Sequence, residues 1–568
     1  MKTKKNAAQL LLECLLAQKA ELVFGVPGES FLPLLDALHN SPLRFCNTRN
    51  ETGASFMAEA CGKLTGRPGL CLVTRGPGAT YAAAGIHTAR HNSTPMILLI
   101  GQAERGALGR GAFQEIDYKR FYGDEIKRSE EIHDPRRIPE TIARAYATAM
   151  QGRPGPVVVS LPEDMLYEEV DAQTEAAAAQ FCPPGPEPSG LARAREMIES
   201  AKTPLLFAGG GGWDGDARKC LRAFAEANAL PVAVSFRRHD LMDNYSACYV
   251  GDAGVGMPEG MRRAFKDADV ILALGVRFGE ISTDNYRLLQ CPLPSQRLIH
   301  VHPDSAELGK IYQGELSIHA SPRLFLEALA NENLKGDFDA RKSWCGRLRG
   351  EFLARLDCPK QPGRLDMGIV TAWLRERLPA DVIVTNGAGN FASWPNKFLL
   401  YGEKARLLAP QNGIMGYGLP AAIAAKLLNP DRLVLCFAGD GDLQMTSQEL
   451  ASAAQLHAAP VILLLRNDMY GTIRMHQERR FPGRVSGTKI ENPDFVALAR
   501  AYGFHAERID ETGAFEEAFE RACASKSGAL LELAMDPEGI TPFERLRKDG
   551  GFVGDPIPKR SDISGQYA

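Results

Sequence analysis

The chain has no hydrophobic run that approaches the roughly 18 residues needed to cross a membrane. Its basic first residues, MKTKK, are followed at 6–20 by a segment with Gln, Glu and Lys, which is typical of an amphipathic helix and not of a signal peptide. Neither sign of charge predominates, because 66 Lys and Arg residues face 69 Asp and Glu residues. These absences predict a cytoplasmic protein with no membrane partner and no nucleic-acid partner.

Paired cysteines are also missing, since the 12 cysteines are scattered and form no CxxC motif. Their spacing excludes the usual signature of a zinc site or a redox dithiol. Several lie in apolar runs, such as Cys71 in LCLVT and Cys436 in LVLCFAG. We therefore expect buried, reduced thiols.

The sequence does contain short apolar runs that end in glycine and alternate with helical patterns. Examples are ELVFGVPG, PMILLIGQ, VIVTNGAGN and LVLCFAGDGD. Such runs are typical of parallel strands that are buried on both faces. The pattern predicts an α/β protein built from doubly wound parallel-sheet domains.

Two polar stretches, 171–190 and 331–364, are predicted to be linkers. They divide the chain into an N-terminal domain at 1–170, a central domain at 190–330 and a C-terminal domain at 363–545. The tail that follows is rich in Gly, Pro and polar residues, so we expect it to be loosely ordered.

The first and third domains carry a similar unit of strand, Gly-X-Gly turn, small-residue helix and second strand. The turn is GPG at 76–78 in the first domain and GDG at 439–441 in the third. Two copies of one unit predict related folds and a site shared between them.

The GDG turn has the features of a metal-assisted phosphate site. Gly439 and Gly441 allow close approach of a phosphate, and the helix that begins there offers free N–H groups. A carboxylate facing a diphosphate needs a cation between them, so Asp440 is a candidate Mg²⁺ ligand. Asn467 ends the next apolar strand, at the same edge of a parallel sheet, and can share the ion. A plain turn with an Asn cap is the alternative.

The GDG motif with Asn467 resembles the thiamine-diphosphate fingerprint, and nearly the whole chain resembles the acetolactate synthase / pyruvate decarboxylase superfamily, most of all the acetolactate synthase-like large subunits. The resemblance implies related pyrimidine-binding and diphosphate-binding domains on either side of the central domain. It implies a cofactor held between the first domain of one subunit and the third of another, hence a homodimer or a homotetramer. The expected activity is decarboxylation of a 2-oxo acid with carboligation. A simple decarboxylase or C–C lyase that releases an aldehyde is the alternative.

The resemblance also implies roles for individual residues. Glu51, in TRNETGA, would hydrogen-bond N1′ of the aminopyrimidine. The Gly413 carbonyl would accept from the 4′-amino group, and Met415 would support the bend of the cofactor. The Met469 carbonyl would join the Mg²⁺ ligands, and Ile473 would contact the thiazolium ring. The residues expected around the diphosphate are Gly389, Asn390, Gly439, Gly441 and Asp442.

The candidate substrate residues favour different branches of the family. Gln114, in FQE, resembles the synthase loop at the mouth of the active site, and Lys127 matches a lysine near the synthase substrate channel. Glu29 stands where simple decarboxylases have an aspartate that can donate a proton and so favour aldehyde release. His476 and Thr472 replace a tryptophan and a methionine of the synthases. Ligase and decarboxylase therefore both stay open.

The central domain resembles the FAD-binding domain of acetolactate synthases. It keeps the glycines of 209–212, the Gly-Val-Arg that ends at Arg277, and Asp304. The following segment, FGEISTDNY, departs from the family pattern. FAD, an ADP-like nucleotide and an empty site remain the alternatives, since a Gly-rich turn alone is a weak signal.

Overall fold

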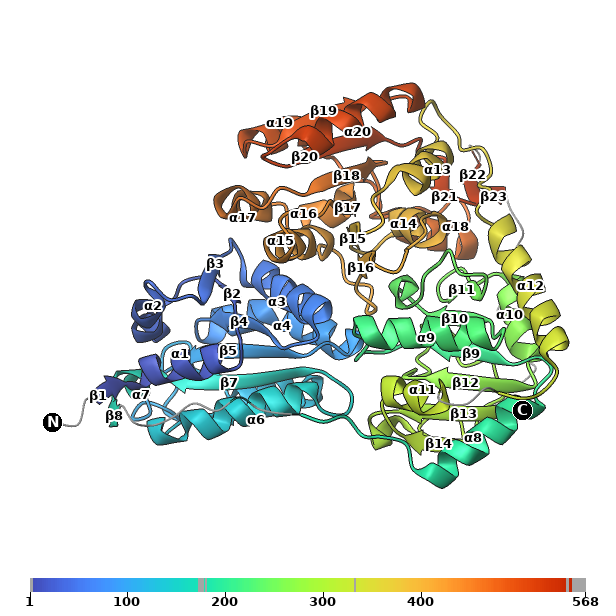
Figure 1. Cartoon of the computed structure of the whole chain (residues 1–568). Coiled ribbons are helices and arrows are strands. Elements are labelled where there is room, and N and C mark those ends of the chain that lie inside the picture. Colours follow the sequence, from blue (N-terminus) through green and yellow to red (C-terminus); the bar gives the residue numbers. More distant parts are fainter. Residues whose placement is uncertain (1–3, 172–177, 179–180, 331–333, 548–550, 554–568) are drawn as a thin grey trace.

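The computed structural model describes residues 4–171, 178, 181–330, 334–547 and 551–553. It contains three six-stranded parallel sheets, each flanked by helices, which confirms the predicted fold class (Figure 1). The N-terminal domain has the strand order β3-β2-β4-β5-β7-β6, and a small antiparallel pair, β1 (Lys4–Asn6) with β8 (Glu169–Asp171), lies beside it. Its main strands are β2 (Leu22–Gly25), β3 (Arg44–Asn47), β4 (Gly69–Val73), β5 (Met96–Gln102), β6 (Arg128–Glu131) and β7 (Pro156–Pro162). Its helices are α1 (Ala7–Ala17), α2 (Leu32–Leu38), α3 (Glu51–Thr65), α4 (Gly76–Asn92), α5 (Tyr118–Tyr122), α6 (Ile138–Met150) and α7 (Glu163–Tyr167).

The C-terminal domain repeats the topology of the first. Its strand order is β16-β15-β17-β18-β20-β19, which matches the first sheet strand for strand in chain order. Its strands are β15 (Ile383–Asn386), β16 (Arg406–Leu408), β17 (Val434–Gly439), β18 (Val461–Arg466), β19 (His505–Ile509) and β20 (Ala529–Ala534). Its helices are α13 (Met367–Arg377), α14 (Ser393–Phe398), α15 (Gly418–Leu428), α16 (Asp440–Gln444), α17 (Glu449–Leu456), α18 (Gly471–Arg480), α19 (Phe495–Ala501) and α20 (Phe515–Ala524). The equal order confirms that the two domains share one fold, as the repeated Gly-X-Gly unit predicts.

The central domain has a different strand order, β11-β10-β9-β12-β13-β14. Counted along the chain this is 3-2-1-4-5-6, the order of dinucleotide-binding sheets. Its strands are β9 (Leu205–Ala208), β10 (Val232–Ser235), β11 (Tyr249–Ala253), β12 (Val270–Leu274), β13 (Arg297–His302) and β14 (Leu316–His319). Its helices are α8 (Pro188–Ser200), α9 (Gly215–Ala227), α10 (Glu259–Asp267) and α11 (Pro322–Ala330).

The prediction of a linker at 331–364 is wrong, because this stretch contains the long helix α12 (Phe338–Ala354) along one side of the molecule (Figure 1). Trp344, Cys345 and Leu348 form a buried stripe of that helix against the central domain. The many charged residues around them hide the stripe in the sequence. Most of the other predicted linker, 171–190, lies outside the described residues, and α8 begins at its end. The domain boundaries themselves stay predictions.

The segment after β20 is more ordered than its composition predicts. It forms a three-stranded sheet of β21 (Gly539–Thr541), β22 (Glu544–Leu546) and β23 (Phe552–Val553). The predicted loose tail begins after residue 545, and within its described part Leu546 and β23 belong to this sheet, so the prediction is wrong there. Residues 554–568 lie outside the described part of the chain. Within that part, no helix combines the length and the apolar character needed to span a bilayer. Cys71 and Cys436 are both fully buried and unpaired, as predicted.

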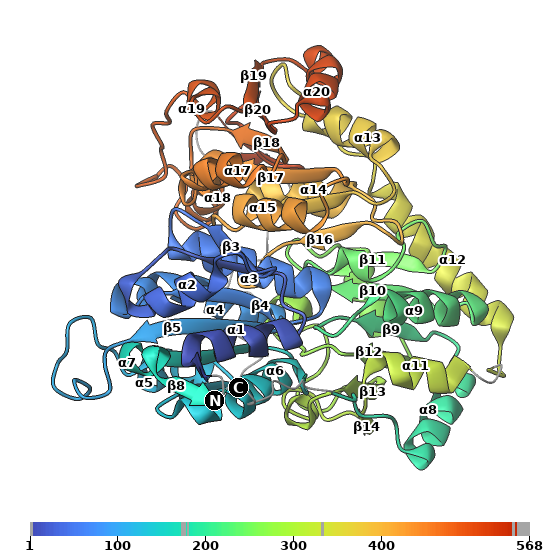
Figure 2. The ribbon, with the colours of Figure 1, turned by 60° about the vertical axis from the view of Figure 1, so that its left-hand side comes forward.

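The first and third domains of one chain pack against each other through α3 and α15, which lie close together in both views (Figure 2). Glu59 of α3 is fully buried in this contact. Its carboxylate accepts hydrogen bonds from Asn92 Nδ2 at 2.7 Å, Thr94 Oγ1 at 2.6 Å and Tyr417 OH at 2.5 Å. One carboxylate therefore satisfies donors from both domains.

Replacing Glu59 by alanine is expected to destabilise the chain by about 3–5 kcal/mol, because the buried donors lose their common acceptor. The measurement is the thermal unfolding midpoint, compared with that of Glu59→Gln, which keeps one carbonyl acceptor and should lose less. Equal midpoints for Glu59→Ala and the parent chain would contradict a role for this carboxylate in holding the domains together.

Candidate active site

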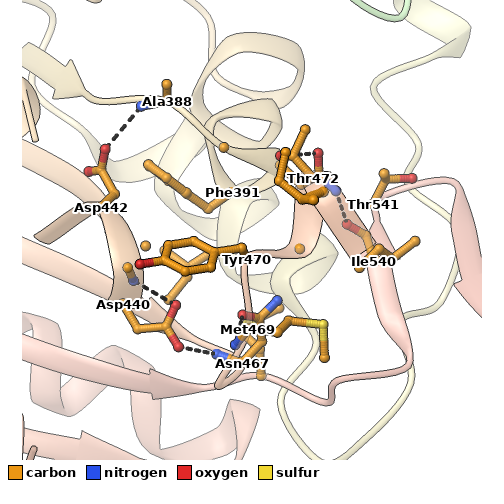
Figure 3. A pocket seen from close by; sticks show the side chains of 18 of the residues that line it. Ala388, Phe391, Asp440, Asp442, Asn467, Met469, Tyr470, Thr472, Ile540 and Thr541 are labelled. Carbon is orange, nitrogen blue, oxygen red and sulfur yellow. Dashed lines mark hydrogen bonds between the residues drawn. The ribbon is translucent and has the colours of Figure 1, made fainter. Parts of the chain in front are cut away.

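A cavity of about 240 Å³ lies in the C-terminal domain where β17 and β18 end (Figure 3). In a parallel sheet the carboxyl ends of neighbouring strands meet at one edge, which is where such folds bind ligands. The cavity gathers the predicted metal ligands and the cofactor-binding residues predicted in the C-terminal domain. These are Gly389, Asn390, Gly413, Met415, Gly439, Asp440, Gly441, Asp442, Asn467, Met469 and Ile473.

Asp440 is the most constrained polar group of this cavity. It follows β17 directly, opens α16 and is 3% exposed. Its Oδ1 accepts from the Gly441 N–H at 2.9 Å, and its Oδ2 accepts from the Asp468 N–H at 2.7 Å and from Asn492 Nδ2 at 2.9 Å. Burial raises the pKa of Asp440, while these donors oppose the rise. The carboxylate is thus held in one orientation, in surroundings that favour a cation beside it.

Asn467 and Met469 lie next to Asp440 at the same edge (Figure 3). The Asn467 N–H reaches Asp440 Oδ2 at 3.3 Å, and Asn467 Oδ1 accepts from the Met469 N–H at 3.3 Å. A carboxylate, an amide and a main-chain carbonyl are hard oxygen donors. Mg²⁺ commonly takes one or two carboxylates together with phosphate oxygens, so this donor set fits Mg²⁺ bound with a diphosphate.

Two aromatic rings leave no room for a side chain at three glycines of the cavity. A Cβ at Gly439 would lie 2.6 Å from a ring carbon of Phe391, and one at Gly441 would lie 2.7 Å from a ring carbon of Tyr470. Gly389 has a φ of +152°, and a Cβ there would also approach Phe391, at 2.9 Å. Any side chain at these three positions would displace a ring that borders the cavity.

Asp442 lines the cavity and connects two of its loops through hydrogen bonds to one carboxylate oxygen. Its Oδ1 accepts from the Gly416 N–H at 2.9 Å and from the Ala388 N–H at 3.0 Å. Burial raises its pKa to about 7. A Cβ at Gly387 would lie 2.0 Å from the same oxygen, so glycine is needed for this close approach. The backbone that carries Gly389 and Met415 is thereby fixed.

Glu51, Gln114 and Glu29, predicted to be catalytic, lie in the N-terminal domain and outside this cavity. They border its own Gly-X-Gly turn. Glu51 Oε1 would be 3.2 Å from a Cβ at Gly78, the Gln114 carbonyl accepts from the Gly76 N–H at 2.9 Å, and Glu29 Oε1 is 3.8 Å from Arg75 Nη2. The glutamates differ in burial, since Glu51 is 9% exposed and the Glu29 side chain is 71% exposed. The chain therefore carries two separate half-sites, at 75–78 and at 439–441.

The structure does not bring Lys127 to either half-site. Its Nζ donates to the Gln151 carbonyl at 2.5 Å and to the Arg153 carbonyl at 2.9 Å, just after the end of α6. Burial lowers the pKa of Lys127 to about 8. In one chain this lysine supports a turn next to the central domain, and a role near substrate stays a prediction.

Ile540 and Asn492, which support residues of the cavity, were not identified from the sequence. Thr472 Oγ1 donates to Asn390 Oδ1 at 2.9 Å, and Asn390 Nδ2 donates to the Ile540 carbonyl at 2.9 Å. The strand β21, beyond the last strand of the main sheet, thus closes one wall (Figure 3). Asn492 also escaped notice, because a lone Asn in a polar loop carries no spacing signal.

Replacing Asn492 by alanine is expected to weaken Mg²⁺-dependent cofactor binding by about 10- to 100-fold, as for other groups that orient a metal ligand. Asn492 Nδ2 holds both Asp440 Oδ2 and Asp468 Oδ1, the latter at 2.7 Å. The measurement is a Mg²⁺ titration of thiamine diphosphate binding, followed by tryptophan fluorescence. Gln444→Ala removes only the donor to Asn492 Oδ1, at 2.8 Å, and should stay within about threefold of the parent chain. Equal affinities of Asn492→Ala and the parent chain would show that Asp440 needs no such support.

A separate cavity of about 480 Å³ lies at the carboxyl edge of the central sheet. The cavity is lined by Gly210, Arg277 and residues 278–282, which belong to the segment that departs from the family pattern. His91 and Gln411 line it from the other two domains. Arg277 Nη2 already donates to the His91 carbonyl at 2.6 Å. Asp304 does not line the cavity, because its Oδ1 caps a short turn through the Ala306 N–H at 3.0 Å.

The sequence matches known proteins in all three domains. Family models for the thiamine pyrophosphate enzymes match the N-terminal TPP binding domain at residues 5–121, the central domain at 191–329 and the C-terminal TPP binding domain at 387–533. The chain is 30% identical over 554 residues to the acetolactate synthase isozyme 2 large subunit of Escherichia coli (strain K12), covering 96% of this chain and 100% of that protein. It is 33% identical over 540 residues to the acetolactate synthase large subunit of Corynebacterium glutamicum, covering 91% and 85%. It is also 31% identical over 554 residues to the probable acetolactate synthase large subunit of Methanocaldococcus jannaschii, covering 95% and 93%.

Proposed function

We propose the activity of this chain from one premise: it belongs to the family of thiamine pyrophosphate enzymes. On that premise it is a thiamine-diphosphate-dependent enzyme that decarboxylates a 2-oxo acid and ligates the remaining acyl unit to a second carbonyl compound, in the manner of an acetolactate synthase. The observation that carries the proposal is the group of oxygen donors from Asp440, Asn467 and Met469 at the edge of a glycine-lined cavity.

Different residues of the cavity would bind Mg²⁺ and the diphosphate. Asp440, Asn467 Oδ1 and the Met469 carbonyl would hold Mg²⁺, and the backbone around Gly389 and Gly441 would hold the diphosphate. When bound, thiamine diphosphate supplies the sink for the electron pair that CO₂ leaves behind. Phe391, Trp394, Met415 and Leu465 give the cavity an apolar wall, which excludes water and favours loss of a carboxylate's charge.

We place the complete site between two copies of the chain, so that Glu51 of one copy faces the cavity of the other. Glu51 would then hold a proton at N1′ of the aminopyrimidine. Both half-sites are bordered by large apolar side chains that are exposed in the single chain. Tyr81 and Phe113 are 55% and 72% exposed near the first half-site, and Met445 and Ile473 are 49% and 52% exposed near the second. Exposed apolar groups of this kind commonly mark an interface.

The activity is tested with purified chain, Mg²⁺, thiamine diphosphate and pyruvate, by following CO₂ release and identifying the carbon product by NMR. The expected product is acetolactate, and omission of Mg²⁺ should remove the activity. Free acetaldehyde would instead support the decarboxylase alternative and assign proton donation to Glu29. Absence of CO₂ with cofactor bound would exclude pyruvate as the donor and require larger 2-oxo acids.

For the central cavity we propose a nucleotide, FAD or an ADP-like molecule, with the phosphates near Arg277 and Lys310. The dinucleotide-type strand order and the Gly-rich turn support this assignment. The test is release of the bound molecule by denaturing the purified chain, followed by its absorption spectrum. A flavin spectrum identifies FAD, and an adenine spectrum alone identifies the ADP-like molecule. Absence of both spectra would contradict the proposal.

A further inference from the structure

A third cavity, of about 340 Å³, lies between the central and C-terminal domains and belongs to neither site described above. The edge strand β11 and helix α10 form one side, the end of α12 forms another, and α14 with Phe543 closes it from the C-terminal domain. Gly251 of β11 has a φ of +108°, and a Cβ there would lie 3.1 Å from Phe352. The close contact of β11 with α12 therefore depends on glycine.

The charges of Asp252 and Lys397, which line this cavity, are already paired with each other. Asp252 accepts from Lys397 Nζ at 2.9 and 3.1 Å, and His239 Nε2 lies 3.4 Å from Asp252 Oδ1. These contacts hold the pKa of Asp252 well below its usual range despite its burial. The pair joins the two domains and needs no further ligand.

Arg355 lines the same cavity and lacks such a partner. It is half-buried at the C-terminal cap of α12, and its guanidinium carbon lies 5.9 Å from the centre of the Phe543 ring. Across the described residues it forms no ion pair and donates no side-chain hydrogen bond. A cation at a helix C-terminus gains some stabilisation from the helix dipole, and the charge of Asp252 also acts on this guanidinium. A partly desolvated guanidinium that donates no side-chain hydrogen bond among the described residues is matched best by a carboxylate.

Two further atoms narrow the chemistry of the ligand. Asn396 Oδ1 and His239 Nδ1 are buried among the lining residues and have no hydrogen-bond partner in the described structure. His239 Nε2 forms no hydrogen bond there either, but it faces Asp252 Oδ1 at 3.4 Å, which leaves Nδ1 for a ligand. Met261, Leu348 and Phe352 give the wall an apolar part, while Arg263 and Glu351 also line the cavity, and Glu351 pairs with Arg347 at 2.9 Å. We propose that this cavity binds a small organic acid that has one carboxylate for Arg355, an aliphatic body for the apolar wall, and a hydroxyl or ammonium group as a hydrogen-bond donor.

The cavity is connected to the catalytic cavity by two short segments. In α14, Trp394 lines the catalytic cavity, while Asn396 and Lys397 line the third cavity. At the end of β21, Thr541 lines the catalytic cavity, and Phe543, two residues later, lines the third cavity. A ligand held by Asn396 and Arg355 is therefore expected to change the affinity for thiamine diphosphate, and the change is reciprocal by linkage.

The binding test uses the full chain with Mg²⁺ and thiamine diphosphate, titrated calorimetrically with three acids of one carbon skeleton. These are leucine, 2-hydroxy-4-methylpentanoate and 4-methylpentanoate, which carry an ammonium, a hydroxyl or no donor. Leucine or the hydroxy acid should bind about fivefold or more tightly than 4-methylpentanoate, and the tighter of the two identifies the ligand class. Failure of all three to bind would overturn the proposal whether or not the chain decarboxylates 2-oxo acids.

Two variants assign the binding to this cavity. Arg355→Met should weaken it by roughly tenfold or more, whereas Lys342→Met, which removes a charge from the exposed face of the same helix, should leave it unchanged. Phe543→Ala alters a residue that is 46% exposed, so it tests the same wall with little risk to folding and should also weaken binding. Binding that persists in both Arg355→Met and Phe543→Ala would place the acid elsewhere.

The coupling between the two cavities is measured through the affinity for thiamine diphosphate. Saturating organic acid should shift the dissociation constant of thiamine diphosphate by about fivefold or more in the parent chain and in Lys342→Met. The shift should disappear in Arg355→Met. An unchanged cofactor affinity in the parent chain would limit the cavity to binding without coupling and overturn this part of the proposal.

Discussion

Replacement of Asp440 by alanine is expected to lower the affinity for thiamine diphosphate in the presence of Mg²⁺ by at least about 100-fold, since groups that merely orient a metal ligand already contribute 10- to 100-fold. Asp440 is the carboxylate of the cavity that lies beside Asn467, from whose N–H it accepts at 3.3 Å, whereas Asp442 accepts from the backbone N–H groups of Ala388 and Gly416. Without it, the diphosphate loses the ion that screens its charge. The measurement is cofactor titration at fixed Mg²⁺ by fluorescence, since Trp394 lines the cavity.

Asp468→Asn is the matched control for this variant. Asp468 lies between Asn467 and Met469, and its side chain is 50% exposed. Its Oδ1 pairs with Arg466 Nε at 2.8 Å and accepts from Asn492 Nδ2 at 2.7 Å, and an asparagine at this position keeps an oxygen acceptor. The Asp468→Asn substitution therefore removes one negative charge near the cavity without removing a candidate ligand. It should change the affinity for thiamine diphosphate by less than about threefold. If the two variants lost affinity equally, general electrostatics would explain the effect and Asp440 would have no special place in the metal site.

The GDG turn and Asn467 of the C-terminal half-site could be predicted from the sequence because their signals are local, whereas the other candidate cofactor residues were implied by the family resemblance: Gly389, Asn390, Gly413, Met415, Met469 and Ile473. The GDG turn lies at the end of one buried strand and Asn467 at the end of the next, so parallel pairing alone brings them together. The same reasoning could not find Asn492, which reaches Asp440 from a loop, or Ile540, which comes from a strand beyond the main sheet. Their positions depend on loop packing, which leaves no periodic pattern.

Helix α12 was missed for a related reason. Its buried stripe of Trp344, Cys345 and Leu348 is surrounded by charged residues, so composition alone suggests a linker. The predicted catalytic residues of the N-terminal domain show a different limit. Glu51 and Asp440 lie in separate half-sites of one chain, and neither sequence spacing nor the fold of a single chain can bring them together.

The separation of Glu51 from Asp440 within one chain predicts a large difference in activity between single variants and mixed dimers. Glu51→Gln and Asp440→Ala are each expected to be nearly inactive, the first by about 10²- to 10⁴-fold through the lost proton-transfer group. If each site combines Glu51 of one copy with Asp440 of the other, a dimer with one copy of each variant contains one site with both defects and one site with none. Such mixed dimers, isolated through two different affinity tags, should recover about half of the parent activity.

The control uses two defects in the same half-site. In a mixed dimer of Asp440→Ala with Asn467→Ala, each cavity carries one of the two defects whichever copy supplies Glu51, so activity should not return. Recovery in the first mixture and not in the second can arise only when Glu51 and Asp440 act from different copies. No recovery in the first mixture, with dimers formed and cofactor bound to the Glu51→Gln copy, would mean that the two half-sites of one chain close on each other, and the exposed apolar borders at Tyr81 and Ile473 would then be buried within the chain and not between copies.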